Sequence, residues 1–228
     1  MLDPGQRSIP VISPRLSKSK FLAGLQCHKR VYLDVHHPDW ASPPDPSTQA
    51  ILDMGTEIGE RARRRFPGGV LIEEGYRKRE AALAHTAAVL ADPTVPAIFE
   101  GAFFYDGVLV RVDILERVQG SEGASPGWRL IEVKSSSRVK DIHLQDLAIQ
   151  RYVLQGMGLT VVSTGLMHLN TQYVYLGDTL DLEALFTIQD VTELVAARGI
   201  DLPSLLAQMQ QVVLQSKPPL VEPDDHCH

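Results

Sequence analysis

The chain has 228 residues, of which 44% are hydrophobic and 22% are charged, and its formal net charge is −6 at pH 7. This composition is typical of an ordinary soluble globular domain, and no apolar run approaches the roughly 20 residues that cross a membrane. The first 15 residues lack the apolar segment of a signal peptide. Two cysteines, Cys27 and Cys227, do not make the disulfide framework of a secreted domain. We therefore expect a cytoplasmic protein with no membrane partner.

The acidic residues gather toward the C-terminus. Residues 177–228 contain nine acidic and two basic side chains, a balance of −7, so residues 1–176 sum to +1. Residues 1–176 would therefore not repel a polyanion such as nucleic acid. The net charge alone does not decide whether the protein binds nucleic acid.

The first third of the chain is expected to be mainly helical. Pro-punctuated residues 1–15 are expected to be flexible. Ser17 is suited to cap a helix whose apolar side includes Phe21. A loop is expected at 40–47. A helix at 49–66 is expected to bury a stripe that includes Ile51, Gly55, Ile58 and Ala62, and a turn at 66–70, a strand at 70–74 and a helix at 79–90 are expected to follow.

The basic side chains in this first third of the chain allow two interpretations. Lys18, Lys20, Lys29 and Arg30 form one locally positive segment, and residues 61–65 contain four arginines. Such charges commonly form a solvated helix face or complement a helix dipole. Contact with phosphate groups is the alternative, and under it Lys20 and Arg30 are candidate nucleic-acid contacts.

The middle of the chain predicts two successive β-hairpins. Residues 96–104 and 108–115 read as strands joined through Asp106-Gly107, a strong hairpin signal. Residues 119–127 are rich in Gly, Ser and Pro and connect to a strand at 128–133. The remaining elements are expected to be a helix at 141–155, strands at 160–168 and 172–176, and amphipathic helices at 182–195 and 202–214. This order predicts an α/β fold with a mixed sheet flanked by helices.

The second hairpin carries the most informative side chains. It brings Asp113 and Glu132 onto paired strands, and Lys134 lies on the same face as Glu132 because side chains alternate along a strand. Carboxylate oxygens are preferred Mg²⁺ ligands, and a lysine beside them can orient water or neutralise developing charge. Glu100 can add a third carboxylate. The alternative is an exposed salt bridge, with Glu100 a plain surface residue.

The chain resembles the PD-(D/E)XK nuclease superfamily in the order of these residues: Asp113, then Glu132-Val133-Lys134, then a helix with Gln and Tyr. Within it the RecB-type nuclease domains are most similar, including the CRISPR-associated exonucleases of that type, and the opening LSKSKFLAGLQCHKRVYL strengthens the likeness. The resemblance implies a restriction-endonuclease-like core at 16–176 with a helical C-terminal extension at 177–228. It also implies a Mg²⁺- or Mn²⁺-dependent nuclease that acts on DNA single strands or ends, in DNA repair or defence.

The resemblance assigns a role to each matching residue. Asp113 and Glu132 would bind the metal through carboxylates and Val133 through its carbonyl, with Glu100 nearby and Lys134 as the catalytic lysine. Tyr152, with Gln145 or Gln150, would take the place of the DNA-positioning Gln–Tyr motif.

Two departures from the family pattern stand out. The usual Gln-xxx-Tyr spacing places Ala148 where Gln is expected. A family metal ligand, a His on the early helix, is replaced by Gly59, for which Glu57 or Glu60 are the possible substitutes. The first departure weakens the case for DNA-end positioning by this helix. The second, together with the acidic C-terminal helices, favours the alternative of a catalytically silent fold that binds nucleic acid or protein. A fragment of a larger nuclease is a further alternative.

The cysteines raise a separate question. In many RecB-like proteins one early and three C-terminal cysteines hold a 4Fe–4S cluster. Cys27 matches the first position and Cys227 the start of the C-terminal set, so a cluster is implied only for a longer form of the chain. That form would have an additional C-terminal domain or a protein partner. A zinc site of Cys27, Cys227 and a histidine is an alternative by ligand type, as is a plain buried Cys27.

Overall fold

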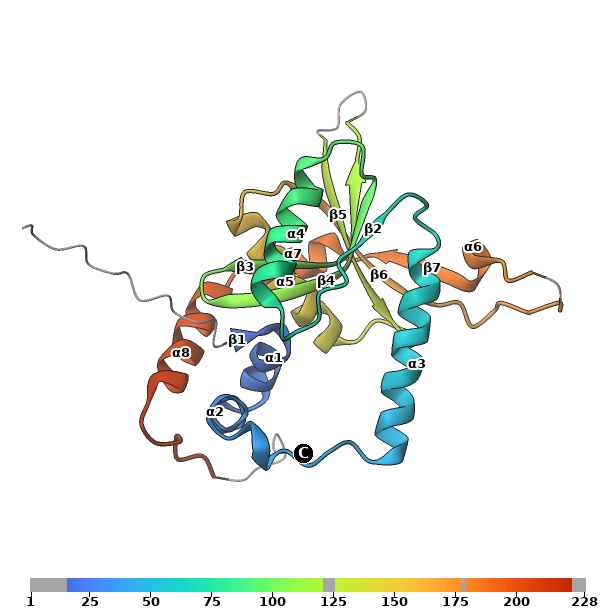
Figure 1. The fold of residues 1–228 in the computed structure, drawn as a ribbon. Helices are drawn as coiled ribbons and strands as arrows, with labels where there is room; N and C mark the ends of the chain where they lie inside the picture. The colour runs from blue at the N-terminus through green and yellow to red at the C-terminus, as the bar shows by residue number, and fades with distance from the viewer. Residues whose placement is uncertain (1–15, 121–125, 178, 223–228) are drawn as a thin grey trace, which may run out of the picture.

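The structure, a computed structural model, describes residues 16–120, 126–177 and 179–222. Within these residues, seven strands form one mixed sheet in the order β2-β3-β4-β5-β6-β7, and β1 pairs with β4 outside that path (Figure 1). β3, β4 and β5 are antiparallel, β5 and β6 are parallel, and β7 returns antiparallel to β6. The strands are β1 (Leu16–Ser17), β2 (Val70–Leu71), β3 (Ala97–Tyr105), β4 (Val108–Val118), β5 (Gly127–Lys134), β6 (Val161–Leu169) and β7 (Phe186–Asp190).

Helices cover both faces of this sheet. The larger hydrophobic core packs against α5, with contributions from α1, α2, α4, α7 and α8, and a smaller core on the opposite face packs under the C-terminal half of α3 (Figure 1). The predicted α/β class with a mixed sheet flanked by helices is therefore confirmed. The helices are α1 (Lys18–Gln26), α2 (His28–His36), the 3₁₀ helix η1 (Pro38–Trp40), α3 (Pro46–Arg63), α4 (Arg79–Ala91), α5 (Asp141–Gly156), α6 (Leu182–Leu185), α7 (Thr192–Arg198) and α8 (Leu202–Leu214).

Local sequence signals account for several boundaries. The Ser17 hydroxyl accepts a hydrogen bond from the Lys20 backbone N–H at 3.3 Å and caps α1, as predicted. Asp106 and Gly107 adopt φ values of 47° and 75°, as a tight hairpin between β3 and β4 requires. α4, α5 and α8 end within one residue of the predicted bounds.

One edge of β4 is shared between two strands. β5 pairs with residues 114–118 of β4, whereas β1 pairs in parallel with Val108 and Leu109. Among the described residues, the part of that edge between the two partners, residues 110–113, pairs with no strand. Because α1 begins directly after β1, the start of α1 lies beside the end of β5, and the polar side chains described below meet there.

Three segments differ from their predictions. Ile58 and Ala62 of α3 are buried as expected, but Ile51 is 59% exposed because the N-terminal half of α3 extends beyond the sheet (Figure 1). Residues 172–176 form a loop rather than a strand. The edge strand is instead β7, inside the segment 182–195 that was expected to be one helix.

Residues 186–190 form a strand and not part of a helix because they pair with the edge of the sheet. Phe186 and Ile188 alternate with polar residues, and pairing with β6 buries Phe186 in the smaller core. A pattern that suits either an amphipathic helix or a half-buried strand was thus decided by a tertiary contact. The expected flexible residues 1–15 and Cys227 lie outside the described residues. Among the residues that are described, no helix has the length and apolarity needed to cross a bilayer.

Candidate active site

Asp113 is held at the point where β4 and β5 stop pairing. The last ladder pair before this point is Ile114 with Ile131. Beyond it, the Asp113 carboxylate takes the place of a backbone acceptor: its Oδ2 accepts a hydrogen bond from the Val133 N–H at 2.8 Å. On the other side of β4, Glu100 has a φ of 54°, so the β3 backbone is also irregular beside Asp113. This deviation from regular strand geometry fixes the position of the Asp113 carboxyl group.

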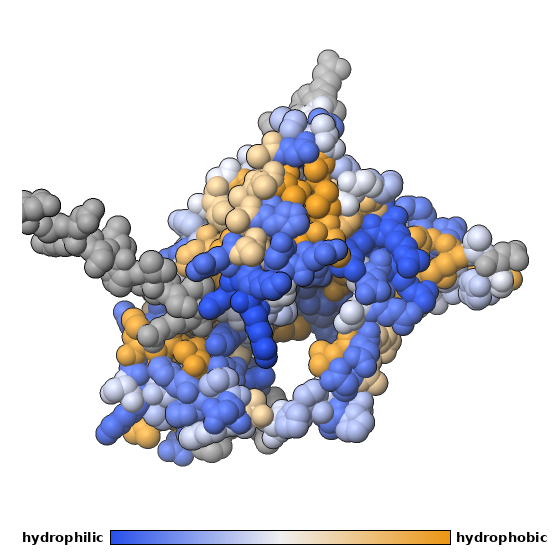
Figure 2. Space-filling view, in the orientation of Figure 1, coloured by the Kyte–Doolittle hydropathy of each residue, from blue (hydrophilic) through white to orange (hydrophobic). Residues whose placement is uncertain are grey.

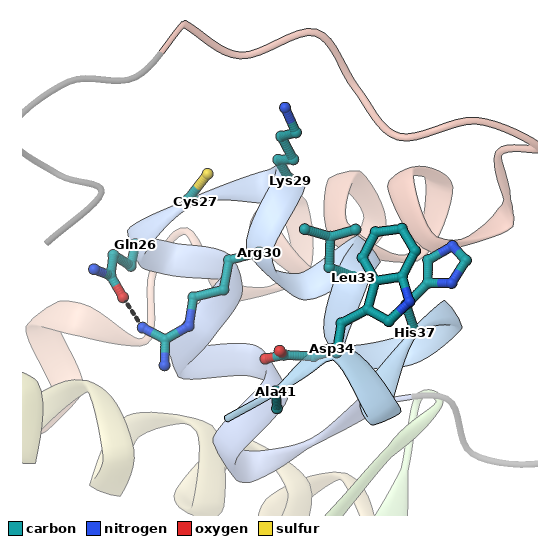
Figure 3. A pocket seen from close by; sticks show the side chains of 9 residues that line it. Gln26, Cys27, Lys29, Arg30, Leu33, Asp34, His37 and Ala41 are labelled. Carbon is teal, nitrogen blue, oxygen red and sulfur yellow. Dashed lines mark hydrogen bonds between the residues drawn. The ribbon is translucent and has the colours of Figure 1, made fainter. Parts of the chain in front are cut away.

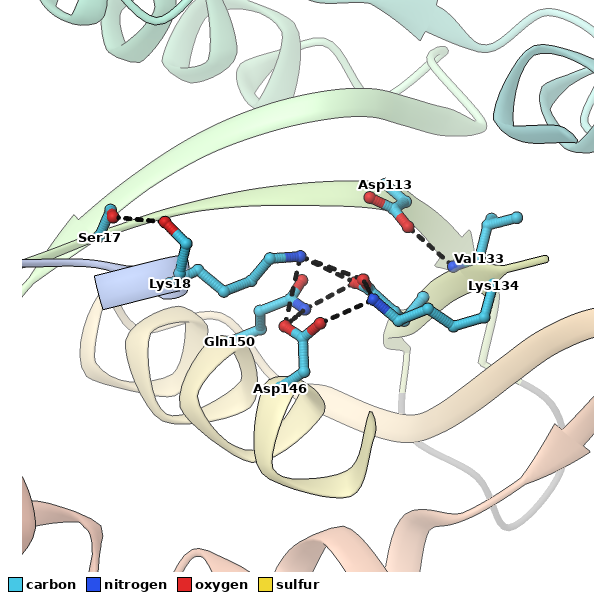
Figure 4. Close-up of polar contacts among 9 residues, drawn as sticks. Ser17, Lys18, Asp113, Val133, Lys134, Asp146 and Gln150 are labelled. Carbon is cyan, nitrogen blue, oxygen red and sulfur yellow. Dashed lines mark hydrogen bonds and ion pairs between the residues drawn. The ribbon is translucent and has the colours of Figure 1, made fainter. Parts of the chain in front are cut away.

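Glu132 is almost completely buried, at 2% exposure. Lys18 Nζ lies 3.1 Å from each of its two carboxylate oxygens. Lys134 Nζ donates to Oε1 at 2.7 Å, and Gln150 Nε2 donates to Oε2 at 2.7 Å (Figure 4). A carboxylate offers about four lone-pair positions. The described contacts of Glu132 therefore use all of them.

Asp146 on α5 is a second buried carboxylate that faces the same three donors. Its Oδ1 lies 3.3 Å from Lys18 Nζ and accepts from Gln150 Nε2 at 2.9 Å. Its Oδ2 accepts from Lys134 Nζ at 2.9 Å. We refer to Lys18, Glu132, Lys134, Asp146 and Gln150 as the carboxylate–lysine cluster; Figure 4 shows these side chains converging from α1, β5 and α5.

Burial and charge shift the pKa values of these groups in opposite directions. Burial, reinforced by the neighbouring charge of Glu132, raises the pKa of Asp113 to about 7. Burial also opposes the ionisation of Glu132, but Lys18 and Lys134 outweigh it and hold the pKa of Glu132 well below its usual range. Burial disfavours both ammonium groups too, yet the adjacent carboxylates raise the pKa of each lysine. At neutral pH, Glu132 is ionised and Asp113 is near the midpoint of its titration.

Asp113 and Glu132 face a cavity of about 510 Å³ between the sheet and α3, which we call the α3 cavity. From α3, Gly55 and Gly59 face this space, and a Cβ atom added at either glycine would meet no described atom within 4 Å. Figure 2 shows the molecule hollowed between α3 and the α1–α2 pair. The other lining residues are Leu52, Thr56, Glu60, Arg63, Tyr76, Glu100, Ile114, Val133, Lys134 and Ser135.

The chemistry of the α3 cavity suits a hard divalent cation. Its lining includes carboxylates, which Mg²⁺ and Mn²⁺ prefer as ligands. Burial, reinforced by the charge of Glu132, raises the pKa of Asp113, and a bound cation would favour the ionised form of this carboxyl group. As the side chains stand, no three acidic, His or Cys groups of the described residues are grouped to hold an ion. An ion shared by Asp113 and Glu132 therefore requires a donor of Glu132 to leave, and Lys134, which lines the cavity, is the accessible one.

The remaining sequence-predicted residues fall into two groups. Gln150 belongs to the cluster, whereas Gln145, five residues earlier on α5, has no described contact with it. Tyr152 lies elsewhere: its hydroxyl donates to Asp106 Oδ2 at 2.9 Å, and its ring meets Tyr105 at the β3–β4 hairpin. The structure thus brings Gln150, but neither Gln145 nor Tyr152, to the carboxylates.

Arg30 and Cys27 lie in a different place, a pocket of about 320 Å³ formed by α1, α2 and η1 (Figure 3). The Arg30 guanidinium donates to Gln26 there, and Trp40 stacks on His37 with ring centroids 4.2 Å apart. Cys27 is the one cysteine among the residues that the structure describes. Those residues alone do not fit a 4Fe–4S cluster with four thiolates, nor a zinc site that needs Cys227.

Lys20 likewise stays outside the cluster. It lies on α1 two residues after Lys18, and burial lowers its pKa against the opposing influence of Asp34.

Two members of the cluster were missed as site residues in the sequence. Lys18 was noted only as part of a basic segment, and Asp146 was not singled out. The i, i+4 spacing of Asp146 and Gln150 on a predicted helix was a usable signal, because such residues share a helix face. The contact of Lys18 with Glu132, 114 positions away, had no local signal.

Comparison with models of protein families finds no match for this sequence, and comparison with curated proteins finds none either. The geometry of the cluster and the motif resemblance are therefore the grounds for a functional proposal.

Proposed function

We propose that the protein is a divalent-metal-dependent nuclease with a restriction-endonuclease-like core of the PD-(D/E)XK type. The observation that carries the proposal is the convergence of Asp113, Glu132 and Lys134 at the end of the β4–β5 pairing, beside the α3 cavity. A surface ion pair, the alternative from sequence, does not account for a glutamate that is almost completely buried.

Each residue has a role in the proposed reaction. Asp113 and Glu132 would hold the Mg²⁺ or Mn²⁺ ion, with the Val133 carbonyl as a further ligand and Glu100 nearby. When bound, such an ion polarises a phosphoryl oxygen and lowers the pKa of the attacking water. Lys134, once released from Glu132, would neutralise negative charge that develops on the phosphate.

DNA single strands or ends are the substrate that we propose. The support is the motif resemblance together with the arginine-rich end of α3. Arg63 lines the α3 cavity, where its guanidinium can bind a backbone phosphate. Arg65 differs, because it is paired with Glu183. A role in repair or defence, and an additional C-terminal domain or partner, remain part of the same proposal.

The test is degradation of end-labelled single- and double-stranded linear DNA with Mn²⁺, Mg²⁺ or EDTA. We expect metal-dependent cleavage by the wild type and a loss of at least about 100-fold in Lys134→Ala, because a charge-stabilising group is removed. Lys217→Ala, which removes an exposed lysine beyond α8, is the matched control and should cleave normally. Cleavage that survives in Lys134→Ala would assign the activity to another site or to a contaminant.

A catalytically silent binding module is the second candidate. It is favoured by the saturated contacts of Glu132 and by the lack, among the described residues, of a preformed three-ligand group. A silent module would bind DNA without cleaving it, and Mn²⁺ would not raise its unfolding temperature. A working site would show both cleavage and stabilisation by Mn²⁺.

A further inference from the structure

Lys18 reaches the two buried carboxylates from α1, whereas Lys134 reaches them from β5 (Figure 4). The backbone of Lys18 is firmly held. This residue is the first of α1, directly after the Ser17 cap and the pairing of β1 with β4. Leu16 before it and Phe21 after it are both buried in the larger core. The position from which the Lys18 side chain extends is therefore set by strand pairing, a helix cap and core packing together.

The Lys18 ammonium bridges the two buried carboxylates. It lies 3.1 Å from Oε1 and from Oε2 of Glu132 and 3.3 Å from Oδ1 of Asp146. A cation that contacts both oxygens of one carboxylate and one oxygen of another occupies the place that a bridging metal ion would take. Gln150 holds the same two carboxylates from α5, so this side of Glu132 is closed.

Lys134 differs from Lys18 in what it contacts and in what it faces. It bonds to one oxygen of Glu132 rather than both. Its side chain is 28% exposed against 21% for Lys18, and Lys134 lines the α3 cavity whereas Lys18 does not. Lys134 rather than Lys18 is therefore the cation that would have to move for a divalent ion to reach Glu132 from the α3 cavity.

We propose that Lys18 is a positioning residue that acts as a fixed cation in place of a second metal ion. It holds the Glu132 carboxylate and restricts the site to one divalent ion, for which Asp113 and Glu132 would be the ligands at the α3 cavity once Lys134 has moved away from Glu132. The inference rests on the proposed nuclease function, because it concerns the metal content of the same site.

The balance of charges agrees with a single ion. The site contains three carboxylates, Asp113, Glu132 and Asp146, against the two ammonium groups of Lys18 and Lys134, so its net charge with every group ionised is −1. One divalent ion changes the resulting net charge from −1 to +1, and a second would bring it to +3 in a buried site, where uncompensated charge is strongly unfavourable. Removal of the Lys18 charge leaves oxygens of Glu132 and Asp146 that a second ion can bridge.

The experiment counts Mn²⁺ ions bound to the full chain by calorimetric titration, with electron paramagnetic resonance as a second measurement of bound Mn²⁺. The variants are Lys18→Met, which removes the charge, and Lys18→Gln, which removes the charge but keeps a hydrogen-bond donor and so protects folding. Lys20→Met is the control, because it removes the same charge two residues along α1, outside the cluster. Circular dichroism establishes that each variant is folded.

We expect one Mn²⁺ in the wild type and in Lys20→Met, and two in the folded Lys18 variants. Two ions in the wild type, or one in a folded Lys18 variant, would overturn the role of Lys18 while leaving a metal-dependent nuclease intact. No ion in the wild type would overturn the proposed metal site itself, and the inference with it. A merely structural role for Lys18 changes stability but not the number of bound ions.

Discussion

The Asp113 carboxylate accepts a hydrogen bond from the Val133 backbone N–H at 2.8 Å, across the point where β4 and β5 cease to pair. This contact holds an acidic group beside a second buried carboxylate, Glu132, instead of allowing it to turn toward water. Burial, reinforced by the charge of Glu132, raises the pKa of this carboxyl group to about 7 in the folded protein, although the hydrogen bond from Val133 itself opposes the rise. Its ionisation therefore costs folding free energy that a bound cation would recover.

Asp113→Asn should change how stability depends on pH. The pKa of Asp113 is raised from 3.8 to about 7 on folding. The stabilising contribution of its proton is therefore complete at low pH and is lost as the pH rises through the window between these two values. Without metal, urea unfolding should show that the wild type loses roughly 1–3 kcal/mol more than Asp113→Asn between about pH 5 and pH 8. Equal losses in both proteins would contradict a raised pKa at Asp113.

Mn²⁺ should stabilise the wild type through the same residue. At a Mn²⁺ concentration about 100 times the dissociation constant, the gain is about 2.7 kcal/mol. Thermal unfolding at about pH 8, where Asp113 is ionised, should show this gain, and at about pH 5.5 the gain should be much smaller. Asp113→Asn should show little change at either pH. A similar rise in both proteins would mean that Mn²⁺ binds elsewhere.

Gln150→Leu should destabilise the protein even though leucine suits a buried helix position. Gln150 donates to both Glu132 and Asp146, so leucine leaves two buried carboxylate oxygens short of a donor. Hydrogen bonds to charged groups contribute roughly 1.5–3 kcal/mol each, and we expect a loss of roughly 2–4 kcal/mol in urea unfolding.

Gln145→Leu is the matched control for this change, because it makes the same substitution five residues earlier on α5, outside the cluster. Its stability should stay within about 0.5 kcal/mol of the wild type. Equal effects of the two substitutions would argue against the bridging role of Gln150.

The sequence predicts the framework of the site better than its contacts. Alternation of apolar residues and the Asp-Gly turn are local signals, so the β3–β4 hairpin and the position of Glu132 beside Lys134 follow from them. The pairing of Lys18 with Glu132 depends on the addition of β1 to the edge of β4, which is a contact between distant segments. A strand of two residues is too short to leave a recognisable pattern in the sequence. β7 was missed for the same reason, because its partner β6 decides its conformation.

Gly59→His should strengthen metal binding. Gly59 lies on α3 and lines the same cavity as Asp113 and Glu132. A Cβ atom there meets no described atom within 4 Å, so the helix can accept a side chain without moving. An imidazole at this position would add a nitrogen ligand to a site that now offers carboxylates. Calorimetry with Mn²⁺ at about pH 8 should show roughly tenfold tighter binding, about 1.4 kcal/mol.

Two comparisons separate a new ligand from a more stable helix. Gly59→Ala should stabilise α3 by about 1 kcal/mol, because alanine favours a helix more than glycine does. It adds no metal ligand, so its Mn²⁺ affinity should match that of the wild type. The advantage of Gly59→His should shrink below the ordinary histidine pKa of about 6.5, because a protonated imidazole does not bind metal. If Gly59→Ala binds Mn²⁺ as tightly as Gly59→His, the gain comes from helix stability, and position 59 does not face the ion.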